Sequence, residues 1–167
     1  LEDHGREKVK GHGFSLHACV LRPESRGMVR LASDRAKDAP AIDPNFLDDE
    51  RDIATLRAGV RLSHRIVEGA ALQRYKPRDR HPVDLGDDEA LDEMIRNRAD
   101  TVYHPVGTCR MGSDEDSVVD PKLKARGVDG LWIADASIMP RLISGNTNAP
   151  SIMIGERCAD FVREALG

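Results

Sequence analysis

The sequence lacks three features that would place a protein in a class at once. No apolar run is long enough to cross a bilayer, and no signal-peptide pattern opens the chain. The three cysteines are odd in number and widely separated, which excludes a disulfide framework and makes a reducing cytoplasm the expected compartment. The formal net charge is -4, so the composition gives no indication of a nucleic-acid partner.

Several cofactor and catalytic motifs are missing as well. Gly11-His12-Gly13 is followed by Leu16 where a dinucleotide-binding fingerprint needs a glycine, and no predicted strand precedes it. The sequence contains no phosphate-binding loop and no Gly-x-Ser-x-Gly elbow. The six histidines show no paired ligand spacing with the cysteines, so no metal site is predicted.

The length of 167 residues suits one domain, or one domain with part of a second. A hydrophobic content of 40% is enough for a core, and 32% charged residues suit a soluble protein. Because the chain begins at Leu1 without a methionine, we expect a fragment of a longer polypeptide. We expect a poorly ordered start over residues 1–12, one segment over 13–100 and another over 101–167.

The first part of the chain has the pattern of strands. Apolar and polar residues alternate over 13–21, and a similar pattern resumes over 28–32 after a turn-rich stretch. Two such runs around a short polar connection predict an antiparallel hairpin. Residues 34–45 contain several Asp and Pro residues and predict an irregular loop with at most one short strand.

Two helices are predicted next. Acidic residues 48–50 precede apolar residues that recur every three or four positions, and negative charge suits the positive end of a helix dipole. A surface loop is expected over 75–85, and Asp87 opens a second helix that ends near 98–100. The apolar positions are Ile53, Leu56, Val60 and Val67 in the first helix, and Leu91, Met94 and Ile95 in the second.

Beyond residue 100 the chain is dense in Gly, Pro, Asn, Asp and Ser, with short apolar runs between them. Residues 131–134 predict a short buried strand ending on Asp135, and 141–150 predict a loop. A last helix is expected to begin near Pro150, because proline is favoured at the first helical position, and to end near residue 165. Its apolar face is formed by Ile154, Cys158, Phe161 and Val162.

Two polar residues of this part are candidates for a functional site. His104 is followed by a proline, which biases the histidine toward extended backbone beside a turn. Asn148 lies just ahead of the last predicted helix, whose N-terminal end favours an anionic group. Spacing alone favours a structural interpretation of each, namely a histidine satisfied by loop backbone and an asparagine that caps a helix.

The order of the motifs in this part changes that interpretation. They cover residues 104–112, 119–121 with 127–131, 134–140, 145–150 and 152–157. Together they resemble the C-terminal region of the glucose-methanol-choline (GMC) oxidoreductases, particularly the branch containing choline dehydrogenase and related alcohol dehydrogenases. The resemblance covers essentially the whole chain and is sharpest from 103 to 162.

The resemblance implies an α+β fold in which helices pack on an antiparallel sheet, as in the substrate (C-terminal) domain of that family. Residues 13–100 would belong to the substrate domain. Residues 101–167 would carry the active-site segment, with a closing strand and helix that contact the flavin domain in the full protein. The Rossmann-type FAD module, which the family carries near the N-terminus, is absent from this sequence.

The resemblance also assigns catalytic residues. The family removes the hydroxyl proton of an alcohol and passes a hydride from the same carbon to the flavin. His104 matches the family's base, and Asn148 matches the polar residue that faces the flavin and the substrate oxygen. An imidazole, with an ordinary pKa of about 6.5, can accept a proton at neutral pH, and an amide can stabilise negative charge without titrating.

Cofactor contacts follow from the same motifs. Asp135 and Ala136 match the pair that lies against the ribityl-diphosphate part of the flavin cofactor. Ala149 and Pro150 match the backbone that approaches the pyrimidine end of the flavin ring, and Asn148 lies between this site and the substrate. The N-terminus of the last helix would oppose the negative charge that hydride acceptance creates.

The partners implied are a small primary alcohol, which could be choline-like, and the N-terminal FAD-binding part of the same polypeptide. FAD is expected in the full-length protein and not on this fragment, which alone should be inactive. Exposed apolar surface is expected where the missing part docks, and it could drive homodimer contacts. Membrane association of the full protein stays open. Two alternatives are a stand-alone small-molecule binding module and a structural module without redox activity.

Overall fold

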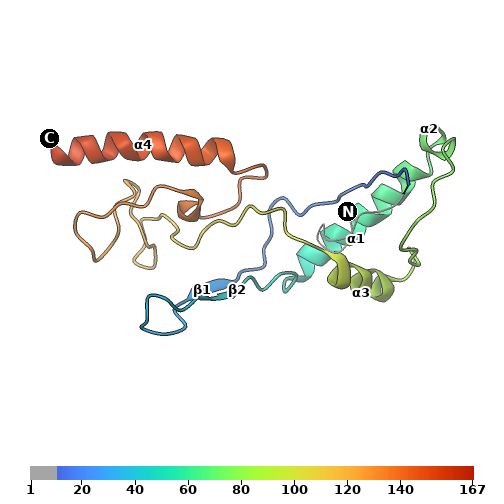
Figure 1. Ribbon diagram of the computed structural model, residues 1–167, viewed down its shortest axis with the longest axis horizontal. Helices are drawn as coiled ribbons and strands as arrows, with labels where there is room; N and C mark the ends of the chain where they lie inside the picture. Colours follow the sequence, from blue (N-terminus) through green and yellow to red (C-terminus); the bar gives the residue numbers. More distant parts are fainter. Residues whose placement is uncertain (1–10) are drawn as a thin grey trace. The chain divides into compact units, whose positions relative to one another are not determined.

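The computed structural model describes residues 11–167, which fold as two compact units (Figure 1). The first unit contains residues 11–20 and Phe46–Thr101, and the second contains Leu21–Asn45 and Val102–Gly167. The poorly ordered start expected over residues 1–12 lies outside the described part of the chain, apart from Gly11 and His12.

The first unit is built on helices α1 (Glu50–Val67), α2 (Ala70–Gln73) and α3 (Asp88–Arg98). The two long helices predicted from the apolar spacing are confirmed as α1 and α3, which pack against each other. Their contact buries Ile53 and Leu91 completely and leaves Ile95 4% exposed. The short helix α2 was not predicted, because four residues are too few for a helical period to be visible.

Acidic residues cap both long helices. The Asp49 carboxylate accepts the backbone N–H of Arg51 at 2.9 Å and pairs with the Arg51 guanidinium at 2.7 Å. The hydrogen bond from the Arg51 side chain is the main reason that the pKa of Asp49 falls to about 2. Asp87 accepts the N–H groups of Glu89 and Ala90 at the start of α3. The predicted placement of negative charge at these helix starts is therefore confirmed.

Charged groups link α1 to α3. The Arg57 side chain is only 14% exposed. Its guanidinium lies 3.0 Å from an Asp88 oxygen and 3.3 Å from an Asp92 oxygen, and it also contacts Glu50. Arg61 reaches Asp88 at 2.5 Å, and this hydrogen bond is the main cause of the lowered pKa of Asp88. Arginine presents several N–H donors in one plane, so a single side chain can serve three carboxylates.

The hairpin predicted between residues 13–21 and 28–32 is wrong. Residues 13–20 form no strand, and a Cβ added to Gly59 of α1 would lie 2.5 Å from the Cβ of Ala18. Alternating apolar residues indicate one face toward a neighbour, but the pattern does not say whether that neighbour is a strand or a helix. Here part of the run contacts a helix.

The strand at 28–32 is confirmed in part, with a different partner. Strand β1 (Met28–Arg30) pairs antiparallel with β2 (Ala41–Asp43), which is the short strand allowed for within 34–45. Gly27 permits the close approach of the two chain segments at the end of this strand pair, since a Cβ there would lie 2.1 Å from the Asp43 carbonyl oxygen. A small antiparallel sheet together with packed helices gives the α+β class that was predicted.

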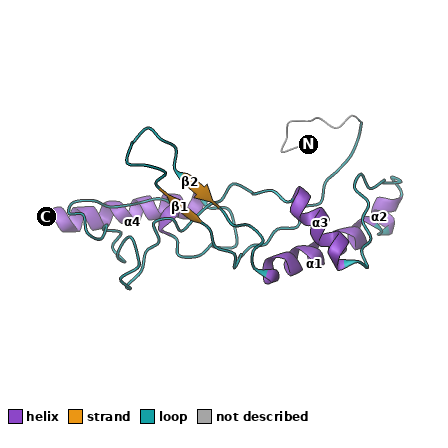
Figure 2. Cartoon of the chain, turned by 90° about the horizontal axis from the view of Figure 1, so that it is seen from below, coloured by secondary structure: helices purple, strands orange, loops and turns teal. Residues whose placement is uncertain are grey.

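The rest of the second unit consists mostly of loops and one long helix, α4 (Asn148–Leu166) (Figure 2). The strand predicted at 131–134 is wrong, because that segment contributes only an isolated bridge from Trp132 to Lys124. A 3₁₀ turn, η2 (Ala136–Ile138), follows. The core joins the loops, η2 and α4, and its buried members are Val119, Leu123, Ile138, Met139, Ile154 and Cys158.

The predicted inner face of α4 is confirmed. Ile154 and Cys158 are buried in the core, and Phe161 and Val162 pack against it. The helix begins two residues earlier than expected, so Pro150 is its third residue rather than its first. Proline is tolerated there because the N–H groups of the first turn have no intrahelical partner in any case.

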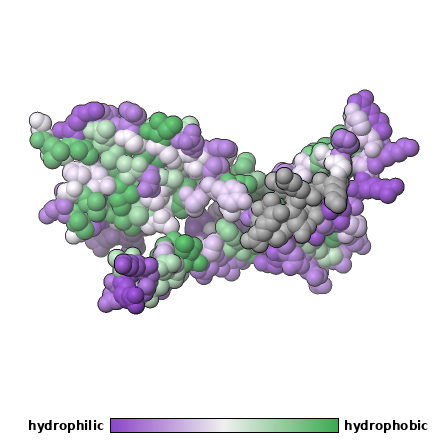
Figure 3. Space-filling view, in the orientation of Figure 1, coloured by the Kyte–Doolittle hydropathy of each residue, from purple (hydrophilic) through white to green (hydrophobic). Residues whose placement is uncertain are grey.

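Apolar side chains also cover part of the surface of the second unit, and Figure 3 shows them along α4 and near the two strands. Ile152 and Met153 of α4 are 61% and 55% exposed, and Ile42 of β2 is 66% exposed. The exposed apolar surface expected from the sequence is therefore present. Among residues 11–167, no helix has both the length and the apolar character needed to span a membrane.

Candidate functional site

His104 lies in a loop of the second unit, at the start of the motif 104–112. The preceding residue, Tyr103, has a positive φ of 62°, which is costly for an aromatic residue and indicates that the surrounding structure holds the backbone in place. The His104 side chain is half-buried, and its Nδ1 lies 3.0 Å from the Oγ1 of Thr147. One ring nitrogen is therefore hydrogen-bonded within the protein, and Nε2 has no protein partner among the described hydrogen bonds.

The motif that follows His104 runs beside η2. The Cys109 N–H donates to the Ser137 carbonyl at 3.0 Å, and the Met111 N–H donates to the Ile138 carbonyl at 2.8 Å. Gly107 has a φ of 90°, and a Cβ on it would lie 3.3 Å from the Met139 carbonyl oxygen. A backbone with this positive φ needs glycine at position 107. The two hydrogen bonds and the close approach of Gly107 together show that the motifs 104–112 and 134–140 are in main-chain contact.

A tight turn fixes the far end of the same motif. Two hydrogen bonds of 2.9 and 2.6 Å connect the Arg110 guanidinium to the Asp114 carboxylate, and they are the main reason that the pKa of Asp114 falls to about 2. A Cβ on Gly112 would lie 2.6 Å from an Asp114 oxygen and 3.0 Å from the Cβ of Ser117. The two hydrogen bonds between Arg110 and Asp114 hold this turn in place. The loop that precedes the turn is therefore held at both ends.

The predicted cofactor residues lie at η2 and at the start of α4, and the helix α4 contacts η2. Asp135 is exposed and caps η2 by accepting the Ser137 N–H at 2.7 Å, and Ala136 is the first residue of η2. Asn148 and Ala149 are the first two residues of α4 and both are exposed, and Pro150 is half-buried. Their roles toward a flavin stay predictions.

The start of α4 has the properties of a site for a polar or anionic group. Thr147 precedes the helix but provides no side-chain cap. The N–H groups of Asn148 and Ala149, at the positive end of the helix, have no partner within α4. One turn further, Ile152 and Met153 are exposed on the same helix. Polar donors beside open apolar surface are what a planar, partly apolar cofactor such as a flavin would need, so these residues fit the group.

Sequence reasoning missed Thr147. It is 9% exposed and is the residue through which the His104 ring is tied to the start of α4. It stands between Asn146 and Asn148, within the loop predicted over 141–150. The available signal was its position directly before a helix, where a threonine is ordinarily a cap.

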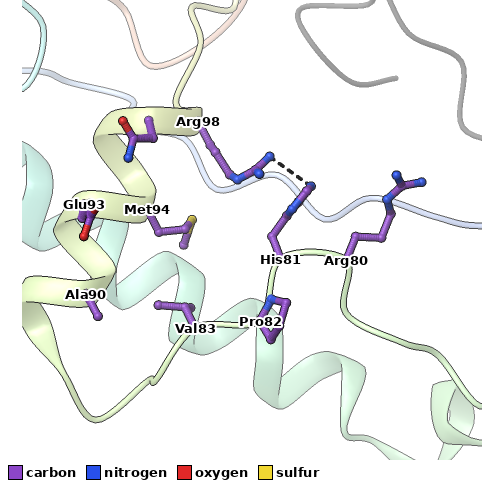
Figure 4. A pocket seen from close by; sticks show the side chains of 9 residues that line it. Arg80, His81, Pro82, Val83, Ala90, Glu93, Met94 and Arg98 are labelled. Carbon is purple, nitrogen blue, oxygen red and sulfur yellow. Dashed lines mark hydrogen bonds between the residues drawn. The ribbon is translucent and has the colours of Figure 1, made fainter.

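A hollow on the described surface lies elsewhere, in the first unit (Figure 4). It has a volume of about 460 Å³ and is lined by residues of α3 and of the preceding loop, with the His81 ring 3.0 Å from the Arg98 guanidinium. None of the predicted site residues lines it. Residues 11–167 also contain no group of three or more His, Cys, Asp and Glu side chains that could hold a metal ion.

Comparisons with known proteins agree with the motifs. A family model described as GMC oxidoreductase matches residues 23–155. The chain is 48% identical over 164 residues to an alcohol dehydrogenase [acceptor] of Pseudomonas putida, covering 97% of this chain and 30% of that protein. It is 46% identical over 165 residues to the oxygen-dependent choline dehydrogenase of Escherichia coli K12, again covering 97% and 30%.

A solved structure is similar as well. An R554A variant of Aspergillus oryzae formate oxidase, solved to study FAD modification, superposes with a TM-score of 0.80 at 30% identity. The match covers 87% of this chain and 26% of that structure. The chain thus spans about 30% of the length of the curated relatives that it matches.

Proposed function

Because this chain belongs to the GMC oxidoreductase family, we propose that it is the C-terminal part of a larger FAD-dependent enzyme that oxidises a primary alcohol. The relatives named above include an alcohol dehydrogenase and a choline dehydrogenase, so choline-like alcohols belong to the proposed substrate class. The single observation that carries the proposal is the hydrogen bond of 3.0 Å between His104 and Thr147, which places the histidine next to the start of α4.

In this proposal His104 is the general base. Its Nε2 accepts the proton of the substrate hydroxyl. The loss of that proton raises the electron density on the oxygen and weakens the C–H bond of the carbon that bears it. The chemistry that FAD supplies when bound is acceptance of the hydride, so the alcohol loses one proton and one hydride and becomes the aldehyde. Asn148 donates a hydrogen bond to the substrate oxygen as negative charge develops on it.

The start of α4 and η2 would hold the cofactor. Asn148, Ala149 and Pro150 would lie along the flavin ring, and the positive end of the helix would stabilise negative charge on it. Asp135 and Ala136 would lie against the ribityl-diphosphate part. The exposed apolar residues of the second unit, including Ile152 and Met153, would be covered by the FAD-binding part of the same polypeptide.

The test uses the full-length flavoprotein that carries this chain. Flavin reduction is followed by its absorbance after rapid mixing with choline and with simple primary alcohols. We expect His104→Gln to slow reduction by about 10²- to 10⁴-fold and Asn148→Ala by about 10²-fold, with the flavin content unchanged. The matched control is His81→Gln, which alters a histidine of the surface hollow in the first unit and should change the rate less than about 2-fold. Normal flavin reduction in His104→Gln would remove the base assignment.

A further inference from the structure

We propose that Thr147 is a positioning residue that holds the His104 ring by Nδ1, so that Nε2 is left to act as the base. The inference deepens the proposed function and rests on it, since it concerns the base of that reaction. The two side chains are 43 positions apart in sequence, and their polar atoms are 3.0 Å apart. Thr147 is 9% exposed, so water competes little for this hydrogen bond.

The Thr147 hydroxyl is available for this bond because it does not cap α4. A threonine at this position ordinarily accepts the N–H of the second or third helical residue. The third residue here is Pro150, which has no N–H, and no side-chain cap from Thr147 is formed. The backbone of Thr147 is itself held, because its carbonyl accepts the N–H of Ser151 at 3.0 Å and the Ser151 hydroxyl at 2.7 Å.

The consequence for His104 follows from the chemistry of imidazole. A neutral ring carries one proton, on Nδ1 or on Nε2, and the other nitrogen is the base. A threonine hydroxyl can donate or accept, and in this proposal Nδ1–H donates to the Thr147 oxygen. The lone pair is then on Nε2, which has no protein partner among residues 11–167. The same bond fixes the plane of the ring. A base must have both the correct tautomer and the correct direction, so removal of the hydroxyl should lower the rate while leaving the base in place.

The test compares two substitutions of the same residue. Thr147→Val keeps the shape and removes the hydroxyl, whereas Thr147→Ser keeps the hydroxyl. In the full-length flavoprotein we expect Thr147→Val to lower kcat/KM for the alcohol by about 10- to 100-fold, mainly through kcat, and Thr147→Ser to stay within about 3-fold of the original. Thr55→Val, at an exposed position of α1 in the first unit, is the matched control and should change kcat/KM by less than about 2-fold.

A second readout does not depend on turnover. The ¹⁵N shifts of the His104 ring, assigned with His104→Gln, report which nitrogen carries the proton. We expect the proton on Nδ1 in the original protein and in Thr147→Ser, and a mixture of both tautomers in Thr147→Val. A proton on Nε2 in the original protein would overturn the inference, as would unchanged kcat/KM in Thr147→Val. If no alcohol reduces the flavin at all, the proposed function fails, and the ring shifts still decide the role of Thr147.

Discussion

Ile138 offers a direct test of how the second unit is held together. It is 2% exposed, it lies at the end of η2, and its carbonyl accepts the N–H of Met111 from the His104 motif. Ile138→Ala removes three buried carbon groups, which corresponds to about 2.4 kcal/mol of transfer free energy at about 0.8 kcal/mol per group. The cavity left behind raises the expected loss of unfolding free energy to about 3–4 kcal/mol.

The assay can be confined to the second unit, because the one tryptophan of the sequence, Trp132, packs against its core. We therefore expect the urea midpoint of unfolding, followed by Trp132 fluorescence in the 167-residue chain, to fall by about 2 M in Ile138→Ala. This assumes that the unfolding free energy decreases by about 1.5 kcal/mol per molar urea. The control is Ile143→Ala in the same unit, whose side chain is 45% exposed and should cost about 1 kcal/mol or less. Equal shifts in the two variants would refute the assignment of Ile138 to the core.

Three further predictions follow from the packing and the charges. Gly27→Ala should break the pairing of β1 with β2, because its Cβ would lie 2.1 Å from the Asp43 carbonyl oxygen. The strand amides that exchange slowly in the original chain should then lose their protection in a hydrogen-exchange measurement. Unchanged protection would contradict this prediction. Arg57→Leu should lower the unfolding free energy by about 1–2 kcal/mol, since the three carboxylates that contact Arg57 lose their shared cation. Unfolding is followed by the circular dichroism of the helices. An unchanged unfolding midpoint would show that the ion pairs of Arg57 contribute nothing to stability. The folded-state pKa of Asp114 is about 2, below its ordinary value, so its pair with Arg110 stabilises the protein above about pH 4 and is lost as the pH falls toward 2. Asp114→Asn should therefore flatten the acid limb of stability followed by tryptophan fluorescence, and a limb as steep as before would exclude this pair as its cause.

The helices could be predicted from the sequence because their signals are local. Each of the two long helices of the first unit has an apolar face at helical spacing and an acidic cap, and both signals lie within the helix or directly before it. Strand partners are not local. The run at 13–21 has the correct period for a strand, but its partner is decided by contacts such as that of Ala18 with Gly59, which no pattern within the run contains.

The candidate site likewise contains residues that could be predicted from the sequence and one that could not. His104 and Asn148 could be singled out because the ordered motifs around them resemble a known family. Thr147 could not, since its contact with His104 joins two segments that are 43 positions apart in the sequence. The strand predicted at 131–134 failed for a related reason, because Trp132 packs on the core as a single bridge between loops. The burial predicted for this run is also only partial, since Leu131 is 45% exposed and Trp132 and Ile133 are half-buried.

The exposed apolar surface and the exposed polar groups of the second unit have one explanation in common. Hydrogen bonds and charges act more strongly on a reaction when water is excluded, yet Asn148 is exposed and His104 is only half-buried. Ile152 lies one helical turn from Asn148 and is 61% exposed. A protein surface that covered Ile152 would gain the free energy of apolar burial and would at the same time remove water from Asn148. In the proposed enzyme, docking of the FAD-binding part and completion of the active site would therefore be the same event. Substitution of Ile152 by Asp should therefore lower both flavin content and turnover in the full-length protein, whereas loss of turnover with full flavin content would separate the two.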